Sequence, residues 1–300
     1  MLKSERHHWW PRCVSRHWAD VDGKTGWISN TGGFRRLRPD ALGQIGNGHH
    51  IKVSHTPGGS SLWDTSFEHE FNLADSTFPD TIQWLESLEC EANPDQPLRN
   101  RFLAQSASDD QLRLLTEAAV SLAVRSPRFR EKCVALAEDL RGPLPEAERN
   151  ALIGMNMRHL QRSISDSLGT NAKFAVLLTR EREFIYGDGF FQNLSGTAPQ
   201  FNMVRLLAPI TPTMSVAIFQ PSQYRPEPRL SAIVLTETEV AACNDAVQIY
   251  SGRDLFFRSQ VPLLLTQFTS GQYMNYASTD NPIDRLMDKL PGVTPRRGPL

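Results

Sequence analysis

Histidine is concentrated near the start of this 300-residue chain. Six of its eight histidines fall within residues 6–55, and they include the pairs His7-His8 and His49-His50. A neutral imidazole binds transition metals and acts as a general base near neutral pH, because its reference pKa is about 6.5. So dense a supply of imidazole predicts a metal site or a proton-transfer site in this stretch.

Adjacent histidines cannot both serve such a site if the chain is extended there, since successive side chains of a strand face opposite sides. One member of each pair is therefore expected to face the site, and the other to pack or to hydrogen-bond. Four of the six tryptophans lie in the same stretch, at positions 9, 10, 18 and 27. A second interpretation stays open, in which these are tryptophan-flanked structural histidines that donate to backbone carbonyls.

Carboxylates that could complete a site occur at two places. Asp188 ends the apolar run EFIYGD and precedes Gly189. A carboxylate where a strand meets a turn serves either in catalysis or in an Asx-turn. Glu68 and Glu70 flank His69 in FEHEF. A strand would place both glutamates on one face, whereas a helix would spread them over a solvated surface, which is the simpler interpretation.

Arginines that could hold an anion surround Pro127, at positions Arg125, Arg128 and Arg130. Guanidinium groups bind phosphate or carboxylate bidentately, so these residues could form a clamp. In the alternative interpretation they pair with helix C-terminal carbonyls and with acids of the chain itself.

A second basic set lies in a predicted hairpin with two aromatic residues. It is either an ordinary charged hairpin or a surface for single-stranded nucleic acid, which binds by stacking and phosphate contacts. Its members are Trp27, Phe34, Arg35, Arg36 and Arg38.

Several function classes lose their usual support. The formal net charge of −1 gives no global electrostatic case for a nucleic acid or a membrane surface as partner. The chain has no P-loop, dinucleotide-binding, GxSxG, HExxH or paired CxxC motif. Its four scattered cysteines predict reduced thiols. Because no apolar run approaches the ~20 residues that cross a bilayer and no signal-peptide core is present, we expect a cytoplasmic protein without a membrane partner.

The elements that must position these residues follow from periodicity and capping signals. Ser108 or Asp109 is expected to cap one helix, and Thr236 with Glu239 to form a capping box at the start of another. The first block predicts a short helix over 13–20, a hairpin over 26–39 and a strand over 48–55. Helices are then predicted over 66–75, over 80–91 after Phe78-Pro79 with Asp80 as N-cap, and over 106–126, 127–140 and 145–168. Strands at 172–179, 182–188, 202–210, 213–221 and 230–236 are followed by helices over 236–251 and 261–268.

This order predicts an α+β fold. It would combine a His/Trp-rich N-terminal β-hairpin and helix region, a helical middle, and a mainly antiparallel C-terminal sheet with covering helices. We expect a single domain over residues 1–300. Its subregions would be a His/Trp-rich cap at 1–62, a helical part at 63–169, a sheet with helices at 170–273 and a flexible tail at 274–300.

Segments spread over nearly the whole chain resemble, in order, the motifs of the domain of unknown function 4238 family. HHWWPRCVSRHWADVDGK is similar to the family's His-aromatic-x-Pro-Arg opening and supplies Pro11 and Arg12. AVRSPRFRE is similar to its Arg-Thr-Pro segment, with Ser126 in place of threonine. EFIYGDGFF, LLAPITPTMSVAIFQP and TEVAACNDAVQIYS are similar to its later strands and its late helix.

The resemblance implies one α+β unit in which distant motifs converge. The implied polar site would be formed by His7 or His8 together with Arg12, Arg125 and Asp188. Asp188 matches the family's aspartate, although its neighbours differ from the usual Ser and Asn-Pro. The activity of the family is not established, so the resemblance implies a site but no reaction.

We therefore predict a metal-assisted phosphodiesterase or nuclease-like hydrolase. In His-Me finger nucleases, which HHWWP and NGHHIKVSH resemble, a base activates water while a divalent metal stabilises charge on phosphate. The predicted catalytic residues are His7, His8, Arg12 and Asp188. The predicted ligands of a divalent metal (Mn, Mg or Zn) are His8, His50 and Asp188. The residues predicted to bind a nucleic acid or another phosphate-containing ligand are Arg125, Arg128, Trp9 and Trp10.

Two other interpretations remain. The protein could be a non-catalytic binding or interaction module, in which Trp9, Trp10, Trp18 and the histidines form a rigid recognition surface. Alternatively, the cluster could be purely structural, in which case removal of His7 and His8 would unfold the chain.

Overall fold

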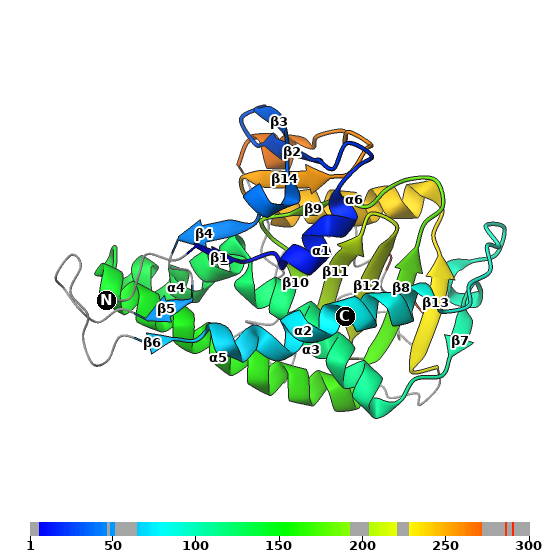
Figure 1. Ribbon diagram of the computed structural model, residues 1–300, viewed down its shortest axis with the longest axis horizontal. Helices are drawn as coiled ribbons and strands as arrows, with labels where there is room; N and C mark the ends of the chain where they lie inside the picture. Colours follow the sequence, from blue (N-terminus) through cyan, green and yellow to red (C-terminus); the bar gives the residue numbers. More distant parts are fainter. Residues whose placement is uncertain are drawn as a thin grey trace, which may run out of the picture.

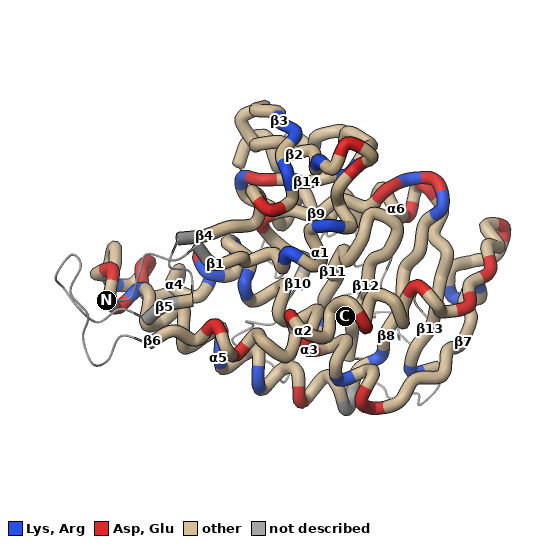
Figure 2. The backbone as a smooth tube through the Cα atoms, in the orientation of Figure 1, with Lys and Arg blue, Asp and Glu red and all other residues tan. Residues whose placement is uncertain are grey.

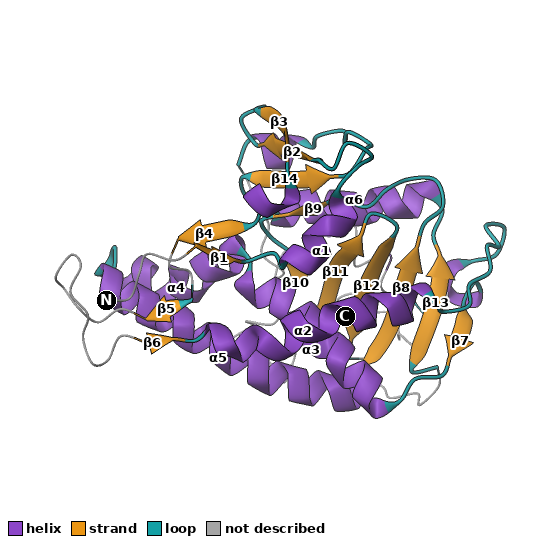
Figure 3. Ribbon diagram, viewed as in Figure 1, coloured by secondary structure: helices purple, strands orange, loops and turns teal. Residues whose placement is uncertain are grey.

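The computed structural model describes residues 6–46, 49–51, 65–192, 204–220 and 228–271, together with Leu286 and Leu290. This part of the chain has an α+β fold, as predicted (Figure 1 and Figure 3). None of the helices in these ranges is long and apolar enough to span a membrane.

The helices and strands are as follows. The α-helices are α1 (Arg12–Ser15), α2 (Asn72–Glu86), α3 (Asp109–Arg125), α4 (Pro127–Arg141), α5 (Glu146–Asn171), α6 (Glu237–Tyr250) and α7 (Thr266–Thr269). The short 3-10 helices are η1 (Arg16–Trp18), η2 (Pro39–Ala41), η3 (Glu68–Phe71) and η4 (Leu98–Asn100). The strands are β1 (Arg6–His8), β2 (Thr25–Ser29), β3 (Phe34–Leu37), β4 (Gln44–Gly46), β5 (His50–Ile51), β6 (Thr65–Ser66), β7 (Leu103–Gln105), β8 (Lys173–Leu178), β9 (Tyr186–Gly187), β10 (Phe191–Gln192), β11 (Arg205–Thr211), β12 (Met214–Phe219), β13 (Leu230–Val234) and β14 (Asp254–Phe257).

A six-stranded sheet forms the centre of the fold, in the order β10-β11-β12-β8-β13-β7. Its strand pairs are antiparallel except for β8 with β13, so the predicted mainly antiparallel sheet is confirmed. Strands β11 and β12 bury every residue, which their largely apolar sequences permit because both faces of the sheet are covered. Helices α2 and α3 lie across the sheet in Figure 1, and their buried side chains share one core with β8, β11 and β12.

A four-stranded sheet in the order β3-β2-β14-β9 connects the N-terminal hairpin with the last third of the chain. The predicted hairpin is present as β2 and β3, and β14 pairs with β2 along its other edge. Gly26 lies so close to Phe257 that an added Cβ would be 2.3 Å from the ring, so only glycine fits here. The indole nitrogen of Trp27 donates to Oδ1 of Asp254 at 2.8 Å. The proposed cap at 1–62 is therefore completed by strands that lie far away in the sequence.

An aromatic stack centred on Trp10 anchors the start of the chain in the core. The Trp10 ring lies 4.1 Å from that of Tyr186 at 10° and 5.6 Å from that of Phe190 at 22°. Tyr186 stacks in turn on Phe256, with ring centroids 4.6 Å apart. The ring of Trp18 lies 4.7 Å from that of Tyr186. The stack thus connects the HHWWP segment to β9 and β14.

Strand β1 leads directly into this stack and pairs antiparallel with β4, with His7 opposite Ile45 and His8 opposite Gln44. The backbone nitrogens of Trp9 and Trp10 both donate to the Gly43 carbonyl. Gly43 has a φ of 65° and would place a Cβ 2.6 Å from that of Trp10. A glycine is therefore required where the chain turns back under the tryptophan.

The capping signals correctly marked two helix starts. Ser108 forms a capping box with Gln111 at the start of α3, and Thr236 forms one with Glu239 at the start of α6. Pro127 begins α4, as predicted.

The predicted break at Phe78-Pro79 is wrong, because α2 continues through Pro79 to Glu86. Proline removes one helical hydrogen bond and crowds the preceding turn. That cost is offset by burial of Ala74, Phe78, Ile82 and Leu85, which lie on one face on both sides of the proline.

The predicted helix over 261–268 is also wrong over most of its length, since only Thr266–Thr269 is helical. The Gln248 side chain donates to the Leu263 carbonyl and accepts from the Leu265 nitrogen, which satisfies the backbone without a helix. Of the predicted strands, 182–188 is reduced to Tyr186–Gly187, and residues 52–55 lie outside the described ranges. The predicted tail at 274–300 also lies outside them, apart from Leu286 and Leu290.

Trp10→Ala is expected to lower the free energy of unfolding by about 3–5 kcal/mol, because it removes a fully buried indole and opens a cavity beneath Tyr186. Chemical denaturation measures this loss. Trp84→Ala is the matched control, since Trp84 is only half-buried and its truncation is expected to have a smaller effect. Equal losses in both variants would contradict a central role for the stack.

Candidate metal centre

Three side chains that could bind a metal converge beside β1. His7 belongs to β1, His49 directly precedes β5, and Glu68 begins η3. One ligand atom from each lies within 4.8 Å of the other two. Both imidazoles are 1% exposed, whereas Glu68 is exposed. The cluster is therefore exposed to solvent on the side of the Glu68 carboxylate.

The spacing of these atoms suits a small divalent ion. Nε2 of His7 and Oε2 of Glu68 are 3.4 Å apart. Two ligands of a tetrahedral zinc ion, each at ~2.0–2.1 Å from the metal, are separated by about 3.4 Å. The rings of His7 and His49 are tilted by 39° with centroids 4.9 Å apart, and one nitrogen of each lies within 4.8 Å of a Glu68 carboxylate oxygen.

Packing and backbone hydrogen bonds hold His49 in this cluster. Its ring lies 5.7 Å from that of Phe67 and 5.1 Å from that of Phe71. Its carbonyl accepts from the Phe67 nitrogen at 2.9 Å, and its own nitrogen donates to Nδ1 of His7 at 3.4 Å. The loop that carries His49 is thus attached both to β1 and to the segment that carries Glu68.

His8 has different neighbours from His7, as expected for adjacent residues of a strand. The charged groups that act on its ring are Arg12, Arg125 and Asp75. Burial lowers the pKa of His8, and the positive charge of Arg12 lowers it further, so the ring is neutral at pH 7. Nδ1 of His8 is buried and has no hydrogen-bond partner among the described residues.

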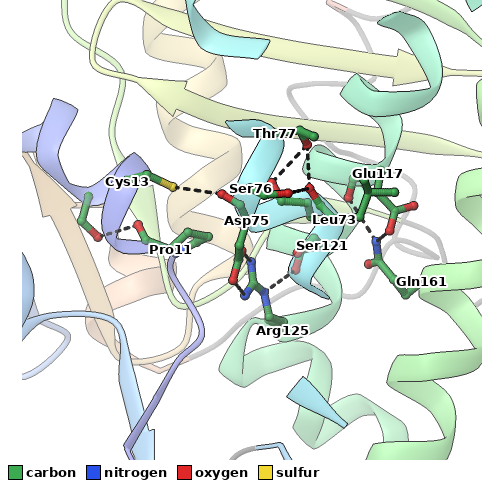
Figure 4. A network of polar contacts seen from close by, with 12 residues as sticks. Pro11, Cys13, Leu73, Asp75, Ser76, Thr77, Glu117, Ser121, Arg125 and Gln161 are labelled. Carbon is green, nitrogen blue, oxygen red and sulfur yellow. Dashed lines mark hydrogen bonds and ion pairs between the residues drawn. The ribbon is translucent and has the colours of Figure 1, made fainter. Parts of the chain in front are cut away.

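Arg125 is held by an ion pair with Asp75, as the alternative interpretation of the arginines around Pro127 expects (Figure 4). Its Nη1 and Nη2 donate to the two carboxylate oxygens of Asp75 at 3.0 and 2.6 Å. Its Nε donates to the Ser121 carbonyl at 3.4 Å, and the guanidinium lies 4.8 Å from the centre of the Phe71 ring. Every nitrogen of this buried group is thus engaged within the chain. Arg125 therefore fits the alternative interpretation, in which it pairs with an acid and a helical carbonyl of the chain itself, and not the predicted phosphate clamp.

Asp188, predicted as a catalytic residue and metal ligand, has another role. Its Oδ1 accepts from the Gly252 nitrogen at 2.8 Å and its Oδ2 from the Arg253 nitrogen at 3.1 Å. These bonds close the turn between α6 and β14. Burial raises the pKa of Asp188 to about 6. Its carboxylate makes no contact with either member of the first histidine pair in the part of the chain that the structure describes.

The other residues predicted to bind substrate are engaged within the fold. Trp9 and Trp10 are 4% and 0% exposed, so neither offers a ring face to a ligand. Trp18 is equally buried, which excludes the recognition surface of three tryptophans. Arg128 is paired with Glu131 on α4. The tryptophans hold β1 in place instead of binding a partner.

Of the predicted metal ligands, the side chain of His50 lies outside the part of the structure that is described. The second histidine pair enters the cluster through His49. Glu68 replaces Asp188 as the carboxylate, although the sequence favoured a solvated helix face for it. Arg12 is exposed and lines a separate pocket.

No family model, no curated protein and no solved structure matches this chain. The resemblance to the domain of unknown function 4238 family stays a prediction.

Asp75→Asn is expected to lower the free energy of unfolding by about 2–3 kcal/mol, because it leaves the buried Arg125 without its counter-ion. The loss stays below the ~3–5 kcal/mol range of fully buried pairs since solvent screens the Asp75 side chain, which is 41% exposed. Glu148→Gln, which breaks the exposed pair with Arg141, should change stability by only about 0–1 kcal/mol in the same denaturation experiment. A similar loss in both variants would show that the Asp75 pair is not structural.

Asp188 is expected to make stability fall as pH rises from about 4 to about 6. The unfolded chain releases this proton near its ordinary pKa of about 3.9, whereas the folded chain holds it to about 6. The unfolded state thus binds fewer protons in this window, and its relative free energy falls. Denaturation of the wild type and Asp188→Asn at several pH values measures the effect as a stability difference that declines with pH. A pH-independent difference would contradict it.

Proposed function

We propose that this protein is a metal-dependent hydrolase of phosphate esters, with its ion bound by His7, His49 and Glu68. The observation that carries the proposal is the convergence of two buried imidazoles and one exposed carboxylate within 4.8 Å. Two histidines and a glutamate are a ligand set of catalytic zinc sites, which keep the fourth position open for water. Imidazole ligands favour zinc over magnesium, which prefers oxygen ligands.

The chemistry follows from the open position. A bound ion lowers the pKa of a water molecule toward 7 and stabilises negative charge on a phosphoryl oxygen. The exposed side of the cluster, where Glu68 meets solvent, is the side from which a substrate would reach that water. The buried histidines would fix the ion from the opposite side.

Arg158 supports a phosphate as the substrate group. Its guanidinium lies 5.9 Å from the centre of the Phe67 ring, and Phe67 directly precedes Glu68. In the part of the chain that the structure describes, no carboxylate pairs with Arg158, whereas Arg162, one helical turn further along α5, is paired with Glu70. Its Nε donates to the Gly154 carbonyl at 3.4 Å, so a guanidinium that contacts the residue preceding Glu68 still has donors for the non-reacting oxygens of a phosphate ester.

The proton on His7 sets a condition for metal binding. Because Nδ1 of His7 accepts from the His49 nitrogen, the proton of the neutral ring is assigned to Nε2, which faces Glu68. An ion at Nε2 requires this proton to move to Nδ1, at the expense of the bond to His49. That hydrogen bond is long, at 3.4 Å, so moving the proton from Nε2 to Nδ1 would sacrifice only a weak hydrogen bond.

Metal titration tests the proposal. Zinc and manganese are each expected to bind the wild type at one ion per chain. Glu68→Gln should weaken binding by more than the ~10–100-fold that changes to second-shell partners produce. Hydrolysis of bis(p-nitrophenyl) phosphate should fall with it. His69→Ala is the matched control, because His69 is an exposed neighbour of Glu68 outside the cluster.

The proposal fails if the wild type binds no stoichiometric ion, or if His69→Ala and Glu68→Gln reduce binding equally. It also fails if hydrolysis survives in Glu68→Gln. His49→Ala provides a second variant, whose fold is checked by circular dichroism because His49 is buried. Glu68 is exposed, so its substitution tests the ligand role without disturbing the core.

A further inference from the structure

A pocket lined by arginine opens beside α1, away from the metal cluster. Its volume is about 290 Å³, and its lining includes Arg12, Arg16, Arg38 and Asp40. None of the three proposed metal ligands lines it. Figure 2 shows Lys and Arg positions in blue near α1 and along the β2-β3 hairpin above it. The volume lies near the lower end of the ~300–1,000 Å³ typical of pockets for small organic ligands.

Two of these arginines have no carboxylate partner in the part of the chain that the structure describes. Arg12 and Arg16 are one helical turn apart and both exposed. Neither has an ion-pair partner among the described residues, and like charges at this spacing repel each other. Arg38 reaches Asp40 at 3.5 Å. The pocket thus presents three guanidinium groups against one carboxylate.

Other arginines nearby are used by the fold. Arg36 is paired with Asp20, and Arg35 lies over the Trp27 ring at 5.7 Å. The charge of Arg12, in contrast, is felt by a neighbouring side chain, because it helps to lower the pKa of His8. Among the described residues, Arg38 has a carboxylate partner in Asp40, whereas Arg12 and Arg16 have none.

We propose that this pocket binds the dianionic phosphate group of a small phosphorylated molecule. Its excess of guanidinium groups suits a dianion better than a single carboxylate, and arginine matches phosphate with paired donors. Beyond the phosphate, the volume leaves space for a small organic group. The site is separate from the metal cluster and does not depend on the proposed hydrolase activity.

Calorimetric titration of the full chain in a chelator tests this site while the metal cluster is empty. The probes are inorganic phosphate, glycerol 3-phosphate and acetate, at about pH 7.5 and at physiological ionic strength. Either phosphate is expected to saturate one site. Tighter binding of glycerol 3-phosphate identifies a monoester as the ligand, and tighter binding of inorganic phosphate identifies the free ion. Acetate should bind more weakly than both.

Arg12→Gln/Arg16→Gln is expected to weaken phosphate binding at least ~10-fold, because each arginine supplies charged hydrogen bonds. Arg35→Gln, an exposed arginine outside the pocket, should leave binding unchanged. Binding of glycerol 3-phosphate should also weaken below about pH 6, where a phosphate monoester loses its second charge.

Three results would overturn the proposal. They are the absence of saturable phosphate binding to the wild type, equal weakening by Arg35→Gln, and acetate binding as tight as phosphate. Because Arg12 and Arg16 are exposed, the double variant should keep the wild-type melting temperature. Arg38→Gln, from the opposite wall, is the second variant and should weaken binding in the same direction.

Discussion

The stacking of Trp10 on Tyr186 is the interaction on which the candidate site depends. It attaches the first described residues to β9 and, through Phe256, to β14. Because Trp10 and Trp9 directly follow the first histidine pair, their burial sets which way the strand is turned. His7 is thereby directed toward His49 and Glu68, and its neighbour toward other groups.

The two sides of β1 have opposite electrostatic characters. On the side of His7, a carboxylate and two imidazoles offer electron pairs to a cation. On the side of His8, Arg12 contributes positive charge, while the charge of Arg125 is balanced by Asp75. The two adjacent histidines of one short strand therefore have different charged neighbours, a glutamate beside His7 and arginines beside His8.

Features that depend on neighbouring residues were predictable from the sequence. The alternation of a strand separated His7 from His8, and the capping residues Ser108 and Thr236 marked two helix starts. Features that depend on residues distant in the sequence were not predictable from it. The turn that binds Asp188 lies more than sixty residues further along the chain, and the strand at 254–257 is too short to show a period. Glu68 was predicted to lie on a solvated face, and its side chain is exposed. Its proximity to His7 and His49 depends on residues that are distant in the sequence.

The same dependence on distant partners affects how the chain can fold during its synthesis. Strand β2 pairs with β14, and Trp10 stacks on a tyrosine 176 positions further along. A ribosome delivers the N-terminal segment first, so the tryptophans and the first histidine pair must wait for most of the chain before they can be buried. During synthesis they form an exposed aromatic segment with a high affinity for other apolar surfaces. The order in which the partners emerge thus makes the segment around Trp10 dependent on residues that are synthesised much later.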